Sequence, residues 1–224
     1  MKRSVLFDTE TTGLDPATGD RVIEIAALEL VGDLPTGRAF HVLLDPERDV
    51  PEEASRVHGF TIDDLRGKPL FADKALEFLE FIGEDPLIAH NARFDFGFLN
   101  AELKRAGHPP LDMGRMVDTL DMARARFPGM PNSLDALCRR FGVDLSARTT
   151  HNALLDCKLL AEVYVELMGG RQHGLGLTAS GSEAPAVLYE APVGRRSIRI
   201  CPTAEELALH AAFIEKLKEP VWNS

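Results

Sequence analysis

The chain has 224 residues, of which 45% are hydrophobic and 27% charged, and its formal net charge is −10. This size predicts one globular domain with an appendage, and no apolar run reaches the roughly 18 residues that predict a membrane span. With this acidic balance the chain alone is expected to bind a nucleic-acid backbone weakly, because phosphate contacts need Lys and Arg. Segment 169–224 is neutral, so the whole net charge lies in the first 168 residues.

Three scattered cysteines and an N-terminus without a signal-like apolar stretch predict a cytoplasmic protein. Cys138, Cys157 and Cys201 form no CxxC pair, so neither a disulfide framework nor a zinc site is expected. If the substrate is nucleic acid, metal ions must supply local positive charge, and a partner protein is expected to strengthen the binding.

The predicted elements begin with three strands. Apolar and β-branched residues predict them over 4–7, 21–31 and 37–44. The turn residues of 32–36 join the second and third strands as a hairpin. A loop rich in proline and acid is expected over 45–59.

Helices and short strands alternate after this loop. Apolar spacing predicts a helix over 71–82, with a core side formed by Ala75, Leu76, Leu79 and Ile82. The later elements are a strand over 86–90, a helix over 93–106, a strand over 115–117 that enters a helix near Asp118, a helix over 134–141 capped by Asn132 and Ser133, and a helix over 152–168 ended by Gly169 and Gly170. This order predicts an α/β three-layer domain over 1–170, with helices on both faces of a mixed central sheet.

The character of the chain changes after Gly170. Residues 171–186 are small and polar, which is typical of a flexible linker. In the small C-terminal tail segment, 187–224, two short strands are expected over 187–200 and a helix that begins at Thr203. This segment has too few apolar residues for a core of its own, so we expect it to order on a partner protein or to fold back on the first domain.

The stretch FDTETTG places two carboxylates, Asp8 and Glu10, at the end of the first predicted strand. Alternate side chains of a strand point to the same face, so these two project together. Taken alone, the pair also fits a solvated strand end that runs into a turn. A buried pair needs a cation, and carboxylate oxygens are the ligands that Mg²⁺ and Mn²⁺ favour.

Two further carboxylates interrupt apolar helix stripes. Asp95 lies one turn before Phe98 and Leu99, and Asp156 interrupts a similar stripe. Each alone also fits the edge of a core or a capping position. Together with the strand pair, they predict four carboxylates that converge at one end of the sheet, a cluster that would be unstable without metal.

His151 stands five residues before Asp156, which places the two about 140° apart around a helix. They cannot share a helix face, so His151 is predicted on the loop just before the helix. From there it could act as a general base on water, since the ordinary pKa of histidine is about 6.5. An exposed loop histidine without a catalytic role is the alternative.

The stretches FDTETTG, HNARFD and HNALLD resemble the three exonuclease motifs of the DEDD family, in its histidine-containing branch. The matching residues, in the expected order, are Asp8, Glu10, Asp95, His151 and Asp156. This resemblance implies a ribonuclease-H-like fold and 3′→5′ removal of single nucleotides with two divalent cations, Mg²⁺ or Mn²⁺. Asp8 is then expected to bind both ions, Glu10 and Asp156 the ion that holds the attacking water, and Asp95 the second ion. His151 is expected to take the proton of the water.

Residues 3–170 also resemble, nearly continuously, the family of proofreading (epsilon) subunits of bacterial DNA polymerase III. The stretches HVLLDPERDVPEEASRVHGFT and ARFPGMPNSLDALCRRFGVD carry this likeness. By position, it implies that Glu53 and His58 contact the terminal nucleotide of a DNA 3′ end, single-stranded or frayed. A mispaired end costs less to unpair, so selectivity can come from melting.

The same resemblance implies two protein partners. Gln172, Leu175 and Leu177, within 172–177, resemble a sliding-clamp-binding peptide without the large aromatic end residue, so weak clamp binding is expected. The alternative for this stretch is a Gly-rich linker. Residues 187–224 are implied to bind the polymerase catalytic (alpha) subunit.

Two other functions remain open from the sequence. One is a free-standing exonuclease of the same fold, acting on small RNAs or repair intermediates, for which the tail would be unneeded. The other is a catalytically silent scaffold that bridges polymerase and clamp, for which the five-residue acidic and histidine set would be unneeded.

Overall fold

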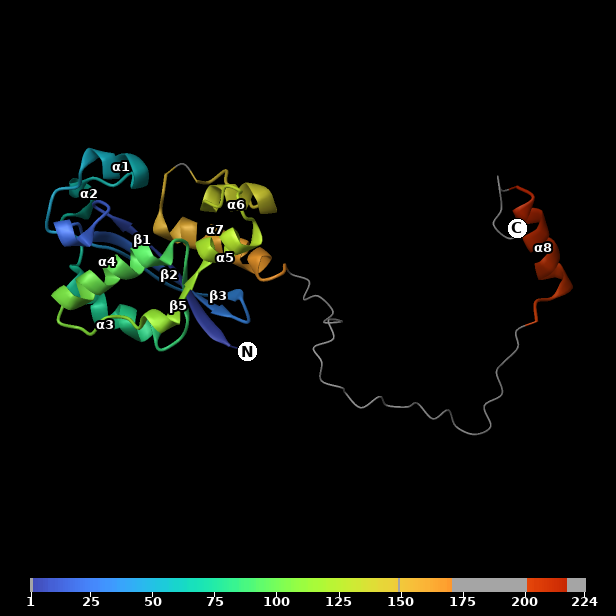
Figure 1. Ribbon diagram of the computed structural model, residues 1–224, viewed down its shortest axis with the longest axis horizontal. Coiled ribbons are helices and arrows are strands. Elements are labelled where there is room, and N and C mark those ends of the chain that lie inside the picture. The colour runs from blue at the N-terminus through green and yellow to red at the C-terminus, as the bar shows by residue number, and fades with distance from the viewer. Residues whose placement is uncertain (1, 149, 171–200, 217–224) are drawn as a thin grey trace, which may run out of the picture. The chain divides into compact units, whose positions relative to one another are not determined.

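The computed structural model describes residues 2–148, 150–170 and 201–216 (Figure 1). The chain divides into two units, Met1–Leu177 and Thr178–Ser224. A five-stranded sheet in the order β3-β2-β1-β4-β5 forms the centre of the first unit. The predicted α/β architecture, a mixed sheet between helices, is confirmed.

The central strand of the sheet is β1 (Arg3–Thr11), which pairs antiparallel with β2 (Val22–Val31) and parallel with β4 (Leu87–Ala89). The outer strands are β3 (Leu34–Leu43), antiparallel to β2, and β5 (Met116–Asp118), parallel to β4. The carboxyl ends of β1, β4 and β5 therefore meet at one edge of the sheet, beside the beginning of β2.

The first strand is longer than the 4–7 predicted. Asp8 through Thr11 continue its ladder, with Asp8 opposite Ala26 and Glu10 opposite Glu24. The prediction that the strand ends at Phe7 is wrong because strand formation here depends on pairing with β2 and not on local apolar content. The shared face of Asp8 and Glu10 still follows from the alternation of the strand.

The connection between β2 and β3 is a two-residue turn and not the longer one expected over 32–36. Gly32 and Asp33 have φ values of 60° and 67°, the left-handed values that a tight hairpin of this type requires. Pro35 is tolerated within β3 because that strand lies at the edge of the sheet.

Helices cover both faces of the sheet (Figure 1). One face is covered by α3 (Phe71–Ile82) and α4 (Ala92–Arg105), and the other by α5 (Thr119–Arg126), α6 (Leu134–Phe141) and α7 (Ala153–Leu167). Phe7 packs on Phe96 of α4, with ring centroids 5.8 Å apart, whereas Leu6 belongs to the core beneath α7. Asp8 and Glu10 share the face of Leu6.

The bounds of these helices agree with the sequence predictions to within one residue. Within α3, however, the predicted core side is wrong at one position. Leu76 is 62% exposed, and the buried set is Phe71, Ala75, Phe78 and Ile82. Phe78 fits the same helical period as Ala75 and Ile82, and its larger ring takes the inward place.

The predicted loop over 45–59 contains a helix, α1 (Glu52–His58), and a second short one follows, α2 (Ile62–Leu65). Pro51 precedes α1, acids occupy its first turn, and Gly59 ends it at φ 82°. Neither helix is long enough to show a periodic apolar pattern, which is why composition suggested a loop. Two 3₁₀ turns complete the described elements of this unit, Pro16–Thr18 and Met113–Arg115.

The second unit contains α8 (Ala204–Ile214), and Thr203 caps this helix by accepting from the Glu206 backbone N–H at 3.3 Å. The prediction that a helix begins at Thr203 is confirmed. The linker expected over 171–186 and the strands expected over 187–200 lie outside the described residues. Among the helices that the structure describes, none has the length and apolar character to cross a bilayer.

Candidate active site

A cavity of about 740 Å³ opens at the carboxyl edge of β1. Every predicted active-site residue within the described part of the chain lines it: Asp8, Glu10, Glu53, His58, Asp95, His151 and Asp156. They come from β1, α1, α4, α7 and the loop before α7, so the fold unites segments that are far apart in sequence. The predicted clamp-binding residues, Gln172, Leu175 and Leu177, lie outside the described residues.

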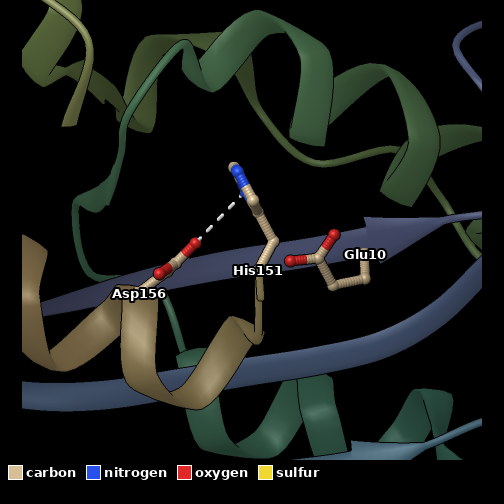
Figure 2. Close-up of side chains that lie close together, drawn as sticks. All are labelled: Glu10, His151 and Asp156. Carbon is tan, nitrogen blue, oxygen red and sulfur yellow. Dashed lines mark ion pairs between the residues drawn. The ribbon is translucent and has the colours of Figure 1, made fainter. Parts of the chain in front are cut away.

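Glu10, His151 and Asp156 turn toward the same space (Figure 2). One possible ligand atom of each lies within 4.8 Å of the others, and His151 Nδ1 is 3.5 Å from Asp156 Oδ2. Asn152 caps α7, so His151 lies just before the helix, as its spacing from Asp156 predicts. Carboxylate oxygens and an imidazole nitrogen at this separation form a donor set for a divalent cation.

Asp95 reaches the cavity from the opposite face of the sheet. Its Oδ1 accepts hydrogen bonds from the Thr9 backbone N–H at 3.1 Å and from Thr9 Oγ1 at 2.7 Å. Thr9 therefore ties α4 to β1 and fixes Asp95, which is only 3% exposed. Asp8 lies on the strand between Asp95 on one side and Asp156 on the other.

The acids strongly disfavour one another's charged forms. Burial, followed by repulsion from Asp95 and Glu10, raises the pKa of Asp8 well above its usual range. Burial, followed by repulsion from Asp156, raises the pKa of Glu10 to about 8. Burial raises the pKa of Asp95 to about 7, although the hydrogen bonds from Thr9 oppose this rise. A divalent cation would stabilise all three carboxylates, so this donor set fits a metal.

These shifts predict an unusual dependence of stability on pH. The pKa of Glu10 is about 8 in the folded chain and 4.5 ordinarily, so between these values the folded state binds more protons than the unfolded state. The free energy of unfolding then falls as pH rises through this window. In EDTA, Tm should therefore fall more steeply from about pH 5 to about pH 8 in wild type than in Glu10→Gln.

Saturating Mg²⁺ should reduce the difference between the two pH profiles, because a bound cation stabilises the charged carboxylates. Parallel profiles of Tm against pH for wild type and Glu10→Gln in EDTA would contradict the raised pKa of Glu10.

Glu24 fixes the beginning of α7. This buried carboxylate accepts from the Ala153 backbone N–H at 3.0 Å and from Asn152 Nδ2 at 2.9 Å, and lies 2.7 Å from His41 Nε2. Asp156 lies in the first turn of α7 and His151 lies just before the helix, so Glu24 positions both. The sequence analysis missed Glu24, although an acid within the apolar run VIEIAAL is a signal of such a buried contact.

A cation that the sequence analysis also missed lies among these acids. Arg148 donates from Nε and Nη2 to the two oxygens of Asp156, each bond 2.6 Å long, and from Nη1 to Asp135 Oδ1 at 2.6 Å. The Arg148 side chain is only 9% exposed. No spacing rule places a loop arginine beside a helix carboxylate, so the sequence carried no signal for this contact.

One wall of the cavity is α1. The His151 backbone N–H donates to the Val57 carbonyl at 3.0 Å, which joins the end of α1 to the loop that carries His151. His58 is 4% exposed, and its Nδ1 accepts from the Phe60 backbone N–H at 3.1 Å. Burial, and then the neighbouring His151, lowers the pKa of His58. The ring is therefore neutral near pH 7, with its proton on Nε2.

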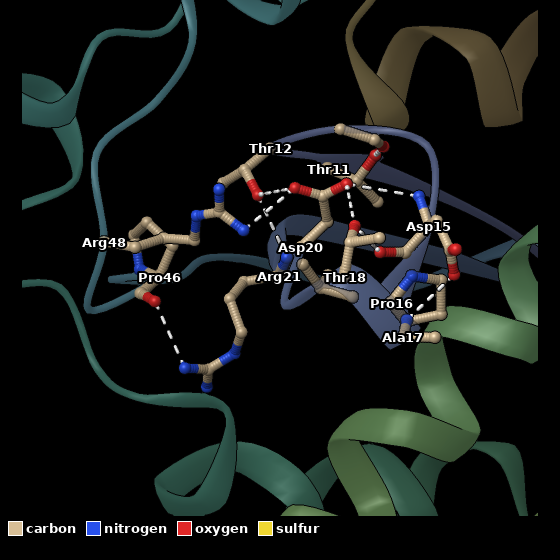
Figure 3. A network of polar contacts seen from close by, with 12 residues as sticks. Thr11, Thr12, Asp15, Pro16, Ala17, Thr18, Asp20, Arg21, Pro46 and Arg48 are labelled. Atoms are coloured by element: carbon tan, nitrogen blue, oxygen red, sulfur yellow. Dashed lines mark hydrogen bonds and ion pairs between the residues drawn. The ribbon is translucent and has the colours of Figure 1, made fainter.

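The loop that follows β1 forms another part of the cavity rim, and Figure 3 shows its polar contacts. Asp20 braces it by accepting from Arg48 Nη1 at 2.9 Å and from the Asp15 backbone N–H at 3.2 Å. A Cβ on Gly13 would approach Asp20 Oδ2 to 2.2 Å, so a side chain there would displace the Asp20 carboxylate from these contacts. The braced loop presents Leu14, which is 85% exposed, to the cavity.

Comparison with known proteins extends this description. Residues 5–164 match the model of the exonuclease family (RNase_T). The chain is 48% identical over 221 residues to the DNA polymerase III subunit epsilon of Rickettsia typhi, covering 96% of each chain. It is 40% identical over 232 residues to the subunit of the same name from Escherichia coli K12, covering 98% of this chain and 95% of that one.

Solved structures give a consistent picture. Exonuclease X in complex with 5′ overhanging duplex DNA matches with a TM-score of 0.59 and 26% identity, over 75% of this chain and 91% of that one. An Escherichia coli exonuclease I–single-stranded DNA complex matches with a TM-score of 0.64 and 20% identity, over 74% of this chain and 41% of that one. This second likeness shows the fold alone.

Proposed function

The chain belongs to the exonuclease family and, within it, to the epsilon subunits of DNA polymerase III, and from this we infer that it is a bacterial proofreading 3′→5′ exonuclease. The likeness to the Rickettsia typhi subunit over 96% of both chains carries this inference. It extends through the tail, which favours a polymerase subunit over a free-standing exonuclease. The acidic cavity with His151 favours an active enzyme over a silent scaffold.

We propose that Asp8, Glu10, Asp95 and Asp156 hold two divalent cations, Mg²⁺ or Mn²⁺. Asp8 lies between the other acids and is suited to serve both positions, with Glu10 and Asp156 on the side of His151 and Asp95 on the other. Bound cations would acidify a water and stabilise the charge that develops on the scissile phosphate.

Side chains of the protein would carry out proton transfer and hold the terminal nucleotide. The half-exposed His151 is suited to take a proton from water that enters the cavity. Glu53 and His58 line the wall formed by α1, where we propose that they contact the terminal nucleotide. His58 offers its Nε2–H as a neutral donor there, because its Nδ1 already accepts from the Phe60 backbone.

Selectivity for a mispaired end is supported by the apolar side chains of the rim. Leu14 and Val57 are 85% and 48% exposed, and both line the cavity together with Phe94. Apolar and aromatic side chains of this kind pack against bases that have left the stack. A terminal base that is already unpaired reaches them at lower cost than a paired one.

We propose that the tail binds the protein partners. The described helix of the tail, α8, exposes more than half of the side chains of Leu207, Leu209 and Phe213. Exposed apolar side chains of this kind are suited to bind a partner protein, and we assign segment 187–224 to the polymerase alpha subunit. We assign the exonuclease to 1–170, a linker to 171–186 and weak binding of the sliding clamp to 172–177.

The proposal is tested by co-elution with the polymerase alpha subunit of the same organism. The full chain and a chain that ends at Gly170 are each passed through gel filtration with that subunit. Release of the 3′ nucleotide from a 5′-labelled, mispaired primer is measured in each fraction. We expect both chains to cleave in Mg²⁺ or Mn²⁺ and only the full chain to co-elute.

A substitution in the full chain tests whether α8 itself contributes to binding of the alpha subunit. Phe213→Asp should lower the affinity for the alpha subunit about tenfold or more, and so reduce co-elution, because it places a charge in an apolar contact. The matched surface change Glu205→Gln should leave this affinity unchanged. Cleavage without co-elution by the full chain would instead favour a free-standing exonuclease. The absence of any EDTA-sensitive cleavage would favour the silent scaffold.

A further inference from the structure

Arg148 contacts both groups on which the proposed reaction depends. Its Nε and Nη2 donate to Asp156 Oδ1 and Oδ2, each at 2.6 Å. The same Nη2 lies 3.0 Å from His151 Nδ1 and 3.5 Å from His151 Nε2. One guanidinium therefore engages a proposed metal ligand and the proposed general base at once.

The guanidinium is held firmly in this place. Its Nη1 donates to Asp135 Oδ1 at 2.6 Å, and Asp135 lies in the first turn of α6. The side chains of Arg148 and Asp156 are 9% and 5% exposed, so water screens their pair little. A two-pronged bond between a guanidinium and a carboxylate is among the stronger polar contacts in proteins.

This arrangement conflicts with metal binding at Asp156. Both oxygens of the carboxylate accept from Arg148, so a divalent cation that binds there must share the carboxylate with the guanidinium or replace it. The guanidinium is a cation itself, and it would repel a second cation at this distance. The two therefore compete for the same ligand.

Arg148 also engages the ring nitrogen of His151, the proposed general base. Arginine has donors only, so Nδ1 of His151 must be the acceptor of its contact with Arg148. A neutral imidazole has one acceptor nitrogen, and Nε2 then carries the proton. While Arg148 holds Nδ1, His151 has no free nitrogen with which to take a proton from water.

We propose that Arg148 and a divalent cation exchange on Asp156, and that this exchange frees His151 to act as the base. The inference rests on the proposed metal site and adds a device that couples the base to the metal. When a cation takes Asp156, Arg148 leaves both oxygens and Nδ1 of His151, and stays attached to α6 through Asp135. His151 can then accept a proton from water only when a divalent cation is bound at Asp156.

The test compares Mn²⁺ binding by the full chain and two variants, measured by calorimetry. Arg148→Gln removes the competitor, so Mn²⁺ should bind about tenfold more tightly than to wild type. Arg139→Gln is the matched control: its side chain is 74% exposed and lies 3.9 Å from the same Asp135 but is not paired with Asp156. The affinity of this control should equal that of wild type. An unchanged or weaker affinity in Arg148→Gln would overturn the exchange.

A second measurement uses the wild-type full chain. The ¹⁵Nε–¹Hε signal of Arg148, assigned through its loss in Arg148→Lys, should be protected from solvent exchange in EDTA and lose that protection in saturating Mg²⁺. Retained protection would overturn the exchange. A wild-type chain that binds neither Mg²⁺ nor Mn²⁺ would overturn the proposed function as well, which distinguishes the two failures.

Discussion

Asp8→Asn should lower kcat for release of a mispaired 3′ nucleotide by roughly 10⁴-fold or more. Asp8 lies between Asp95, Glu10 and Asp156, so among the residues that the structure describes it is the carboxylate placed to serve both proposed cation positions. The substitution keeps the shape of the side chain and removes its charge. The measurement is single-turnover cleavage of a labelled, mispaired primer in saturating Mn²⁺.

The same variant should be more stable than wild type in EDTA near pH 8. Burial and then repulsion from the neighbouring acids disfavour the charged form of Asp8 and raise its pKa well above its usual range, and an amide avoids this cost. Loss of activity with a higher Tm therefore separates a functional role from a structural one. Asp121→Asn, an exposed change on α5, should leave both quantities unchanged. A fully active Asp8→Asn enzyme would remove the basis of the metal proposal.

His151→Gln should lower kcat by about 10²- to 10⁴-fold and change KM much less, because a general base acts on the proton of the water and does not hold the substrate. Part of the loss should be recovered at higher pH, where hydroxide is more abundant. The measurement is the profile of kcat against pH for wild type and variant. A variant with the pH profile of wild type would contradict the assignment of the base.

Metal affinity distinguishes a base from a ligand at this position. His151 lies within 4.8 Å of Glu10 and Asp156, which is also close enough for a nitrogen ligand. If His151 is the base, Mn²⁺ affinity in His151→Gln should stay within about threefold of wild type. A loss of tenfold or more would identify a ligand instead. His108→Gln, a change of the same kind away from the cavity, serves as the control.

The parts of the fold that followed from the sequence are those with a local signal. The helices over 71–82, 134–141 and 152–168 carry long apolar periods or clear caps, and the structure places them within one residue of those bounds. The segment of α1 carries signals only at its two ends, so its composition predicts a loop. β1 continues past Phe7 because its polar half pairs with β2, a partner that local pattern does not reveal.

The acids of the cavity were predicted because motif order and a family resemblance place them together. The residues that hold those acids were not. Thr9, Glu24 and Arg148 act through contacts with residues 86, 129 and 8 positions away, respectively. Glu24 and Arg148 belong to none of the three motifs, and Thr9 lies within FDTETTG without a spacing that reveals its contact. Their identity as contacts depends on where the strands and helices meet, so only the three-dimensional structure reveals them.

The bond between Glu24 and the start of α7 has a consequence for the order in which the chain is made. Asp8 and Glu10 leave the ribosome early, but Asp156 joins them only when α7 docks on Glu24 of β2. A nascent or partly folded chain therefore has an incomplete acid set, and such a chain should not degrade nucleic acid. Activity therefore requires complete folding of the first unit, and the segment proposed to bind the polymerase is synthesised after that unit.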